Sequence, residues 1–363
     1  MSATRRVRAL IVDDSAIARD LLERGLSLDP GIEVVGKASD AYSARDKIVF
    51  LKPDVVTLDV EMPKMDGIAF LRKLMPQYPL PVIVVSAVTA EGSRKALEAL
   101  EAGAFDIVAK PSAYDAFGLK AMVAELAEKV KAAGRTEPGK IRSLAGGLAR
   151  PSPPAGRPAS DRRFRGRPVG KVIALGASTG GTVALSKVVT ALPADSPPVL
   201  IVQHMPPVFT RMFAESMDRQ SAVRVKEAED GEELERGTAL VAPGDLHLTV
   251  VRSGRRLEAR LDDGPKVSGH RPSVDALFLS AAEAVGPDAV AALLTGMGRD
   301  GADGMLALRR SGARCVAQDE PSSVVFGMPK EAWENGAAET LVPIELMARE
   351  IMARVGDPAA GRA

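Results

Sequence analysis

Short apolar runs that alternate with amphipathic segments constrain the fold of this chain more than any other feature. The runs are apolar on both faces, which is typical of strands in a parallel sheet that helices cover on both sides. An amphipathic segment over residues 16–27 follows the first run. Before residue 130 the runs are 7–12, 33–36, 54–58, 81–85 and 106–109. After residue 170 they are 171–176, 199–203, 239–241, 289–295 and 314–317.

The two groups of runs predict two α/β domains, each with a doubly wound parallel sheet. Between them, Pro, Gly, Ser and Arg dominate and nothing repeats with a helical or strand period. We therefore expect an N-terminal domain over residues 1–130, a flexible Pro/Gly/Arg-rich linker over 131–170, and a second domain over 171–355. The arginines of the linker suit solvation, with an acidic partner as the alternative; they are Arg157, Arg162, Arg163, Arg165 and Arg167.

Composition excludes several classes of protein. The 48 Lys and Arg residues nearly balance 47 Asp and Glu residues, so we expect no DNA binding driven by overall charge. No apolar stretch approaches the roughly 18 to 20 residues of a membrane span, so we expect no membrane insertion. Cys315 is the single cysteine and cannot form an intramolecular disulfide, which predicts a cytoplasmic protein with Cys315 as a small buried hydrophobe.

Acidic side chains gather where strands of the first domain end. Asp13 and Asp14 follow one strand and Asp59 another, while Ser86 and Lys110 end two further strands. Ligands of open parallel sheets bind beyond these strand ends. Three carboxylates there would repel one another unless a hard cation such as Mg²⁺ lay among them, with a Lys and a hydroxyl to hold a phosphoryl group. The alternative is that Asp13 or Asp14 simply caps the following helix.

These residues lie in motifs that resemble the receiver domain of two-component response regulators over residues 5–125. The motifs are Asp13-Asp14, Leu58-Asp-Val-Glu-Met-Pro63, Met65-Asp-Gly67, Ser86-Ala87 and Lys110-Pro111. The resemblance implies a flavodoxin-like fold in which Asp59 accepts a phosphoryl group. It also implies that Asp13, Asp14 and Asp59 hold Mg²⁺, and that Ser86 and Lys110 sense the phosphoryl group. The family often carries an aromatic switch residue three positions before the lysine, but this chain has Ile107 there, with Phe105 nearby.

A serine on a glycine-rich turn is the first candidate catalytic group of the second domain. The sequence Gly176-Ala-Ser-Thr-Gly-Gly181 follows a strand and has the Gly-x-Ser-x-Gly spacing of a nucleophile elbow, which exposes the hydroxyl of Ser178. A phosphate-binding turn or a purely structural turn is the alternative.

A base and a carboxylate for this serine are predicted at two neighbouring strand ends. His204 ends the strand 199–203, and Asp300 follows the strand 289–295 within a glycine-rich turn. We expect His204 to accept the serine proton and Asp300 to orient the imidazole. The alternatives are that Asp300 caps a helix near residue 302, or that His270 is the base, as in the Ser, Asp, His order of α/β-hydrolases.

The remaining candidates are an oxyanion hole and a third histidine. Backbone N–H groups near Thr179 and Met297 are the candidates for stabilising an oxyanion. His247 lies in an alternating apolar and polar segment, which favours a satisfied strand histidine. For His270 itself, which precedes a predicted helix start, helix capping or a substrate contact is open.

The second domain resembles the chemotaxis protein-glutamate methylesterases over residues 170–352. The motifs are Gly176-Ala-Ser-Thr-Gly-Gly181, Gln203-His-Met205, Ala242-Pro-Gly244, Gly269-His-Arg-Pro-Ser-Val-Asp-Ala276, Thr295-Gly-Met-Gly-Arg-Asp-Gly301 and Gln318-Asp-Glu320. The resemblance implies an α/β methylesterase domain that hydrolyses glutamate methyl esters on methyl-accepting chemoreceptors and deamidates certain receptor glutamines, without a cofactor for the esterase reaction. It also implies inhibition by the receiver until a chemotaxis histidine kinase phosphorylates Asp59.

Two other classes of output domain remain open at this point. A DNA-binding output domain would need a recognition helix with a basic face, whereas residues 170–363 mix acidic and basic side chains. A catalytically inactive adaptor that binds receptors would carry the same fold without turnover.

Overall fold

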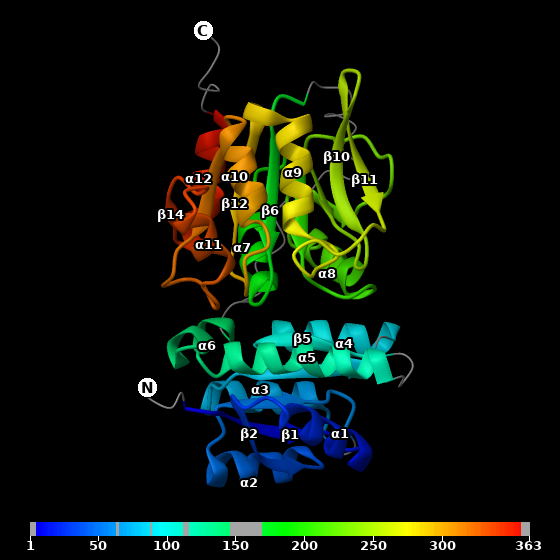
Figure 1. Ribbon diagram of the computed structural model, residues 1–363, viewed down its shortest axis with the longest axis vertical. Helices are drawn as coiled ribbons and strands as arrows, with labels where there is room; N and C mark the ends of the chain where they lie inside the picture. The colour runs from blue at the N-terminus through cyan, green and yellow to red at the C-terminus, as the bar shows by residue number, and fades with distance from the viewer. Residues whose placement is uncertain (1–4, 63–64, 88, 112–115, 146–168, 357–363) are drawn as a thin grey trace. The chain divides into compact units, whose positions relative to one another are not determined.

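The computed structural model describes residues 5–62, 65–87, 89–111, 116–145 and 169–356. The chain divides between Ala149 and Arg150, within the predicted linker, into two compact units. Each unit is an α/β domain built on a parallel sheet, as predicted (Figure 1). Among the helices of the described residues, none combines the length and the apolar character needed to cross a lipid bilayer.

The N-terminal unit contains a five-stranded parallel sheet in the order β2-β1-β3-β4-β5. Its strands are β1 (Val7–Val12), β2 (Ile32–Ala38), β3 (Val55–Leu58), β4 (Val82–Ala87) and β5 (Asp106–Lys110). Its helices are α1 (Ala16–Leu26), α2 (Ala41–Leu51), α3 (Gly67–Gln77), α4 (Ala90–Glu101), α5 (Ala116–Ala133) and α6 (Pro138–Ala145). The strand order reverses beside β1, and Val12 pairs with Leu58, so Asp13 and Asp59 follow neighbouring strands at the same edge.

The helix that follows β1 is capped by Ser15 and not by either preceding aspartate. The Ser15 hydroxyl accepts a hydrogen bond from the Ala18 N–H at 3.3 Å, while Asp13 accepts one from the Ser15 N–H at 2.9 Å. The alternative that Asp13 or Asp14 caps α1 is therefore wrong. A short polar side chain caps the helix one position later, which leaves the carboxylates at the strand end.

Part of the predicted linker is helical. Helix α5 continues to Ala133, and α6 occupies Pro138–Ala145 and packs against α3. Pro138 starts α6 at a position where a missing N–H costs nothing, and Ile141 is buried. The prediction that residues 131–170 lack regular structure is therefore wrong for residues 131–133 and 138–145. Residues 146–168, which contain the arginine cluster, lie outside the described residues.

The C-terminal unit contains a seven-stranded parallel sheet and a separate antiparallel hairpin. The sheet order is β14-β13-β12-β6-β7-β9-β8. Its strands are β6 (Val172–Ala177), β7 (Val199–Gln203), β8 (Arg224–Glu227), β9 (Thr238–Val241), β12 (Ala289–Leu293), β13 (Arg314–Gln318) and β14 (Leu341–Val342). The hairpin is β10 (His247–Ser253) and β11 (Arg256–Asp262). The helices are α7 (Gly181–Thr190), α8 (Phe209–Asp218), α9 (Val274–Ala284), α10 (Ala302–Arg310), α11 (Met328–Glu334) and α12 (Ile344–Gly356).

Strand β6 is the point where the chain reverses its progress across the second sheet. It pairs with β7 on one side and with β12 on the other, and Ala177 is the partner of Gln203. Because the strands are parallel and in this register, Ser178 and His204 leave the sheet side by side at its carboxyl edge. Helices α9 and α10 pack against each other in front of this part of the sheet, in yellow and orange in Figure 1.

Two edge strands of the C-terminal unit, and the pairing of the strand that contains His247 into a hairpin, were not predicted. The edge strands β8 and β14 are four and two residues long, and each strand has only one buried residue. The hairpin packs against α9 and has one exposed face, so its strands alternate in polarity and are not apolar throughout. Short or half-exposed strands lack the continuous apolar pattern on which the sequence prediction depends.

Gly176 lets the start of α9 approach the sheet closely. A Cβ atom there would lie 2.3 Å from Val274 Cγ1 and 3.0 Å from Leu293 Cδ1. We expect Gly176→Ala to cost roughly 1 to 3 kcal/mol by overpacking and to lower the thermal midpoint of the C-terminal unit by roughly 2 to 10 °C. Gly356→Ala is the matched control, because a Cβ atom added at this end of α12 would meet nothing within 4 Å among the described residues. Calorimetry of the full chain measures both midpoints, and equal values for the two variants would contradict the prediction.

Candidate active site

Ser178 lies on a tight turn between β6 and α7. Its N–H donates to the Thr295 carbonyl at 3.0 Å, and its own carbonyl accepts the Gly181 N–H at 2.7 Å. The Gln203 side-chain amide also donates to that carbonyl, at 2.9 Å. Gly180 has a φ of 75°, a left-handed conformation that glycine adopts without strain. These contacts hold the turn from β6, β7 and the segment after β12, so the backbone of Ser178 is fixed from three sides.

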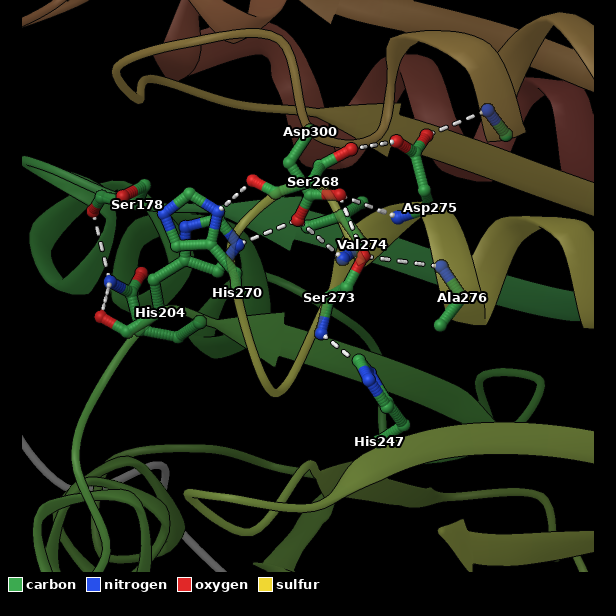
Figure 2. A network of polar contacts seen from close by, with 12 residues as sticks. Ser178, His204, His247, Ser268, His270, Ser273, Val274, Asp275, Ala276 and Asp300 are labelled. Atoms are coloured by element: carbon green, nitrogen blue, oxygen red, sulfur yellow. Dashed lines mark hydrogen bonds and ion pairs between the residues drawn. The ribbon is translucent and has the colours of Figure 1, made fainter. Parts of the chain in front are cut away.

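His204 follows β7 and is anchored at both its backbone and its ring. Its N–H donates to the Ala177 carbonyl at 3.2 Å, and its Nε2 lies 2.7 Å from Asp300 Oδ2. With the carboxylate as acceptor, Nε2 carries the proton and Nδ1 keeps a lone pair. Nδ1 is buried and has no hydrogen-bond partner among the described residues. Figure 2 shows Ser178 on the side of the His204 ring that faces away from Asp300.

Asp300 is buried and accepts hydrogen bonds from four groups. Besides His204, the Ser273 hydroxyl donates at 2.7 Å, the Val274 N–H at 2.7 Å and the Asp275 N–H at 3.1 Å (Figure 2). The two N–H groups belong to the start of α9, where the helix dipole favours a negative charge. Burial raises the pKa of Asp300, but the hydrogen bond and charge of His204 and the donors from α9 outweigh it, and the pKa falls to about 2.

The alternatives considered for Asp300 and His270 are not supported. Helix α10 starts after Gly301, without a side-chain cap, so Asp300 does not cap it. Ser273, and not His270, caps α9 by accepting the Ala276 N–H. His270 Nδ1 lies 2.9 Å from the Ser268 carbonyl, and the carboxylate of Asp300 bonds the ring of His204.

His270 nevertheless lies directly on the ring of His204. The two ring centroids are 3.9 Å apart and the planes differ by 7°. Burial, followed by the neighbouring charge of His204, lowers the pKa of His270 to about 4. A ligand atom of each histidine and of Asp300 come within 4.8 Å of one another. A metal ion lies near the plane of each imidazole that binds it, and one ion cannot lie in two stacked planes, so this cluster does not fit a metal.

The oxyanion-hole candidates flank Ser178. Thr179 is buried beside it, and the Thr295 hydroxyl donates to the Thr179 carbonyl at 3.0 Å. Met297 follows Gly296, where a Cβ atom would lie 2.9 Å from the Cβ of Ser178. The backbone on both sides of the serine is therefore close to it, and the role of these two N–H groups stays a prediction.

His247 and Ser273 complete the surroundings of Asp300. His247 lies on β10 and is buried, with its Nε2 3.0 Å from the Pro265 carbonyl and its Nδ1 accepting the Ser273 N–H at 3.2 Å. The interpretation of His247 as a satisfied strand histidine is therefore confirmed. Ser273 was missed as a site residue, although a serine just before a predicted helix is a recognisable N-cap signal.

A second polar cluster lies at the carboxyl edge of the N-terminal sheet. Lys110 Nζ lies 3.0 Å from Asp13 Oδ2 and 2.6 Å from Asp59 Oδ2. Burial raises the pKa of Asp59 despite the nearby lysine charge. Burial lowers the pKa of Lys110, but the charges of Asp59 and Asp13 outweigh it and leave the pKa raised. The hydroxyl of Ser86 is buried and donates to the Gly92 carbonyl at 3.1 Å.

The residues of this cluster fit a hard divalent cation. Asp13 and Asp59 are buried, Asp14 is exposed, and one carboxylate oxygen from each lies within 4.8 Å of the others. A donor set of oxygen atoms alone, with one side open to water, suits Mg²⁺.

Comparison with known proteins agrees with both units. Residues 173–351 match the family model described as CheB methylesterase, and residues 9–122 match the response regulator receiver domain. A protein-glutamate methylesterase/protein-glutamine glutaminase from Syntrophotalea carbinolica is 51% identical over 348 residues, covering 96% of this chain and 97% of the relative. One from Anaeromyxobacter dehalogenans is 50% identical over 353 residues, covering 97% and 96%. The crystal structure of the Thermotoga maritima CheB methylesterase catalytic domain is 38% identical and covers 51% of this chain and 98% of that one, with a TM-score of 0.50.

The fold and its two polar clusters define a response regulator with an enzymatic output domain. Identity near 50% over almost the full length of its relatives goes further. The chain belongs to the family of protein-glutamate methylesterases/protein-glutamine glutaminases.

The low pKa of Asp300 predicts how stability depends on pH. Because the folded value is about 2 and the ordinary value is 3.8, the ionised carboxylate stabilises the fold above pH 3.8, and this contribution disappears as the pH falls toward 2. We expect Asp300→Asn to lower the free energy of unfolding of the C-terminal unit by about 2 kcal/mol at pH 7. The difference from wild type should shrink below about pH 4.

Denaturant unfolding of the full chain between pH 7 and pH 3 measures this difference. Asp303→Asn is the matched control, because Asp303 is exposed on α10 and pairs with Arg299, four residues earlier in the chain. An exposed ion pair of this kind contributes little to stability. A destabilisation by Asp300→Asn that stayed constant down to pH 3 would show that the carboxylate charge is not its cause.

Proposed function

We propose that this protein hydrolyses methyl esters on glutamate side chains of methyl-accepting chemoreceptors, with Ser178 as nucleophile, His204 as base and Asp300 as the group that orients His204. The observation that carries the proposal is the ring of His204. Its Nε2 is bound to Asp300 at 2.7 Å, while its buried Nδ1 has no partner among the described residues and faces the side where Ser178 lies. A ring fixed in this tautomer can accept one proton, at Nδ1.

Acylation begins when Nδ1 of His204 takes the hydroxyl proton of Ser178. The serine oxygen attacks the ester carbonyl carbon, and the carbonyl oxygen becomes an oxyanion, for which the Thr179 and Met297 N–H groups are the donor candidates. His204 then returns the proton to the methoxy oxygen, the C–O bond breaks and methanol leaves. Asp300 stays ionised throughout and stabilises the charged imidazole, which its low pKa supports.

Deacylation uses the same groups in reverse. Nδ1 of His204 takes a proton from water, the resulting hydroxide attacks the acyl carbon, and the Ser178 oxygen leaves and recovers its proton. The product is a free glutamate side chain. Deamidation of a receptor glutamine follows the same path, with ammonia as the leaving group in place of methanol, and matches the second activity in the names of the relatives.

The receiver controls this reaction in our proposal. A carboxylate oxygen of Asp59 attacks the phosphorus of a phosphohistidine on a chemotaxis histidine kinase, so that a P–O bond forms and the P–N bond breaks. Asp13, Asp14 and Asp59 would hold Mg²⁺, which would supply positive charge against the phosphoryl group and the carboxylates. In the unphosphorylated structure Lys110 pairs with Asp13 and Asp59, and the added negative charge of the phosphoryl group competes for this lysine. Ser86 provides the hydroxyl that senses the phosphoryl group.

The unphosphorylated receiver inhibits the esterase, and phosphorylation of Asp59 relieves the inhibition. Two sites on one chain, each at the switch point of its own sheet, support this division into a sensor and an output domain. We place the reaction in the cytoplasm, because the single cysteine is buried in β13 and a disulfide is impossible within the chain.

Replacement of the nucleophile tests the catalytic proposal. We expect Ser178→Ala to lower kcat for methanol release from purified methylated receptor by about 10⁴-fold or more, because no other group forms the acyl-enzyme. Ser253→Ala, at the exposed end of β10, is the control and should release methanol at the wild-type rate. Turnover by Ser178→Ala would contradict the mechanism. A wild-type protein that binds receptor but releases no methanol would be an adaptor and not an enzyme.

Replacement of the phosphoryl acceptor tests the regulation. With a small phosphodonor such as acetyl phosphate and Mg²⁺, methanol release by the wild type should rise, and Asp59→Asn should not respond. Asp46→Asn, an exposed carboxylate on α2, is the control and should respond like the wild type. An Asp59→Asn variant that still responds to the phosphodonor would place the regulation at another residue.

A further inference from the structure

We propose that His270 is a positioning residue for His204: its ring covers one face of the His204 ring and keeps Nδ1 directed at Ser178. The inference rests on the proposed function. The centroid distance of 3.9 Å and the angle of 7° describe two rings in full face contact. Figure 2 shows that the rings overlap, with Ser178 on one side and Asp300 on the other.

The hydrogen bond to Asp300 cannot orient His204 by itself. It fixes one atom, Nε2, at 2.7 Å, and the ring can still turn about the direction of this bond. Such a turn moves Nδ1, which is the atom that must face the serine. A flat partner on the ring face prevents it, because the two planes must stay parallel to keep contact.

The segment that carries His270 is built to present the ring. The N–H of Val267 donates to the His270 carbonyl at 3.1 Å, and the His270 N–H donates back to Val267 at 2.9 Å, which closes a tight turn. Ser268 and Gly269 complete the turn with φ values of 51° and 82°, both in the left-handed region. A non-glycine residue in this region carries local strain, so other contacts must hold the turn.

Those contacts lead from the turn to the buried side chain of Asp275. The Ser268 hydroxyl donates to Asp275 Oδ2 at 2.9 Å, and Asp275 Oδ1 accepts the Gly304 N–H at 2.7 Å. Asp275 is itself buried on α9, beside the donors that hold Asp300. One helix therefore fixes both the carboxylate that binds His204 and the turn that carries its stacking partner.

The remainder of the loop between β11 and α9 is also held by hydrogen bonds. His247 Nε2 donates to the Pro265 carbonyl at 3.0 Å, and Arg271 donates to Asp245 Oδ1 at 2.8 Å and to the Gly264 carbonyl at 2.8 Å. Both ends of the loop are thus tied to the hairpin side of the unit. These hydrogen bonds support the loop and with it the position of the His270 ring.

The stacked ring is also kept neutral. The Ser268 carbonyl only accepts hydrogen bonds, so His270 Nδ1 carries the proton. Burial and the charges of His204 and Lys266 lower the pKa of His270 to about 4, against the opposing influence of Asp300. When His204 takes the serine proton and becomes positive, an uncharged neighbour at this distance does not repel it.

Three substitutions of His270 separate stacking from hydrogen bonding. His270→Phe keeps a flat ring and loses the bond to Ser268, His270→Asn keeps an amide donor and loses the ring, and His270→Ala loses both. We expect the Ala and Asn variants to lower kcat for methanol release about 10- to 100-fold with little change in KM, because misorientation of the base affects the transition state. The Phe variant should recover most of the wild-type kcat.

The thermal midpoint of each variant is measured alongside kcat and KM. A wild-type kcat in His270→Ala would overturn the inference, as would recovery by Asn and not by Phe, which would assign a polar role to His270. If the Ala variant does not fold, the comparison of Phe with Asn still decides. Ser178→Ala is assayed in parallel: turnover by that variant would overturn the proposed function itself, whereas an inactive Ser178→Ala beside a fully active His270→Ala would overturn only the role of His270.

Discussion

The charge of Asp300, buried at the start of α9, is the interaction on which the site depends. Four donors surround the carboxylate, and they come from the end of β7, from the helix cap and from the first turn of α9. A buried charge is tolerated only when hydrogen bonds satisfy it in this way. Here the same hydrogen bonds also join separate segments of the chain at the carboxyl edge of the sheet. The tautomer of His204 follows from this arrangement, whereas the close approach of α9 to the sheet depends on the missing side chain of Gly176.

The receiver also holds a buried carboxylate, Asp59, but with fewer hydrogen-bond donors than Asp300 has. Asp13 and Asp59 leave neighbouring strands at the switch point of the first sheet, and both lie against Lys110. Asp59 accepts hydrogen bonds from Lys110 and from the Glu61 N–H, and burial still raises its pKa, whereas the donors around Asp300 lower the pKa there. Asp59 has two donors where Asp300 has four, so its carboxylate is less fully satisfied. A carboxylate held by four donors stays where it is, which suits a group that only orients another.

Sequence patterns were a good guide to the strands that carry the site and a poor guide to the residues that support it. The runs that precede Ser178, His204 and Asp59 are strands within one or two residues of the predicted ends, because a strand buried on both faces is apolar throughout. The patterns missed α6, where Ile141 buries a short helix inside a segment dominated by polar and small residues. They also left the relation of His270 to His204 open, because 66 positions separate the two residues. The rings stack only because the loop before α9 brings His270 to His204, and the path of that loop depends on hydrogen bonds of Asp275 and Arg271.

The chain order of strands and helices, the residue types at the strand ends and the absence of an intramolecular disulfide are all readable from the amino acids, because they depend on local periodicity and chemical identity. Which nitrogen of His204 faces the serine, which side chain caps α9 and which ring covers His204 depend on atoms from segments that are distant along the chain. Such contacts are chosen by packing and by the satisfaction of buried polar groups, and both exist only once the sheet and helices have come together.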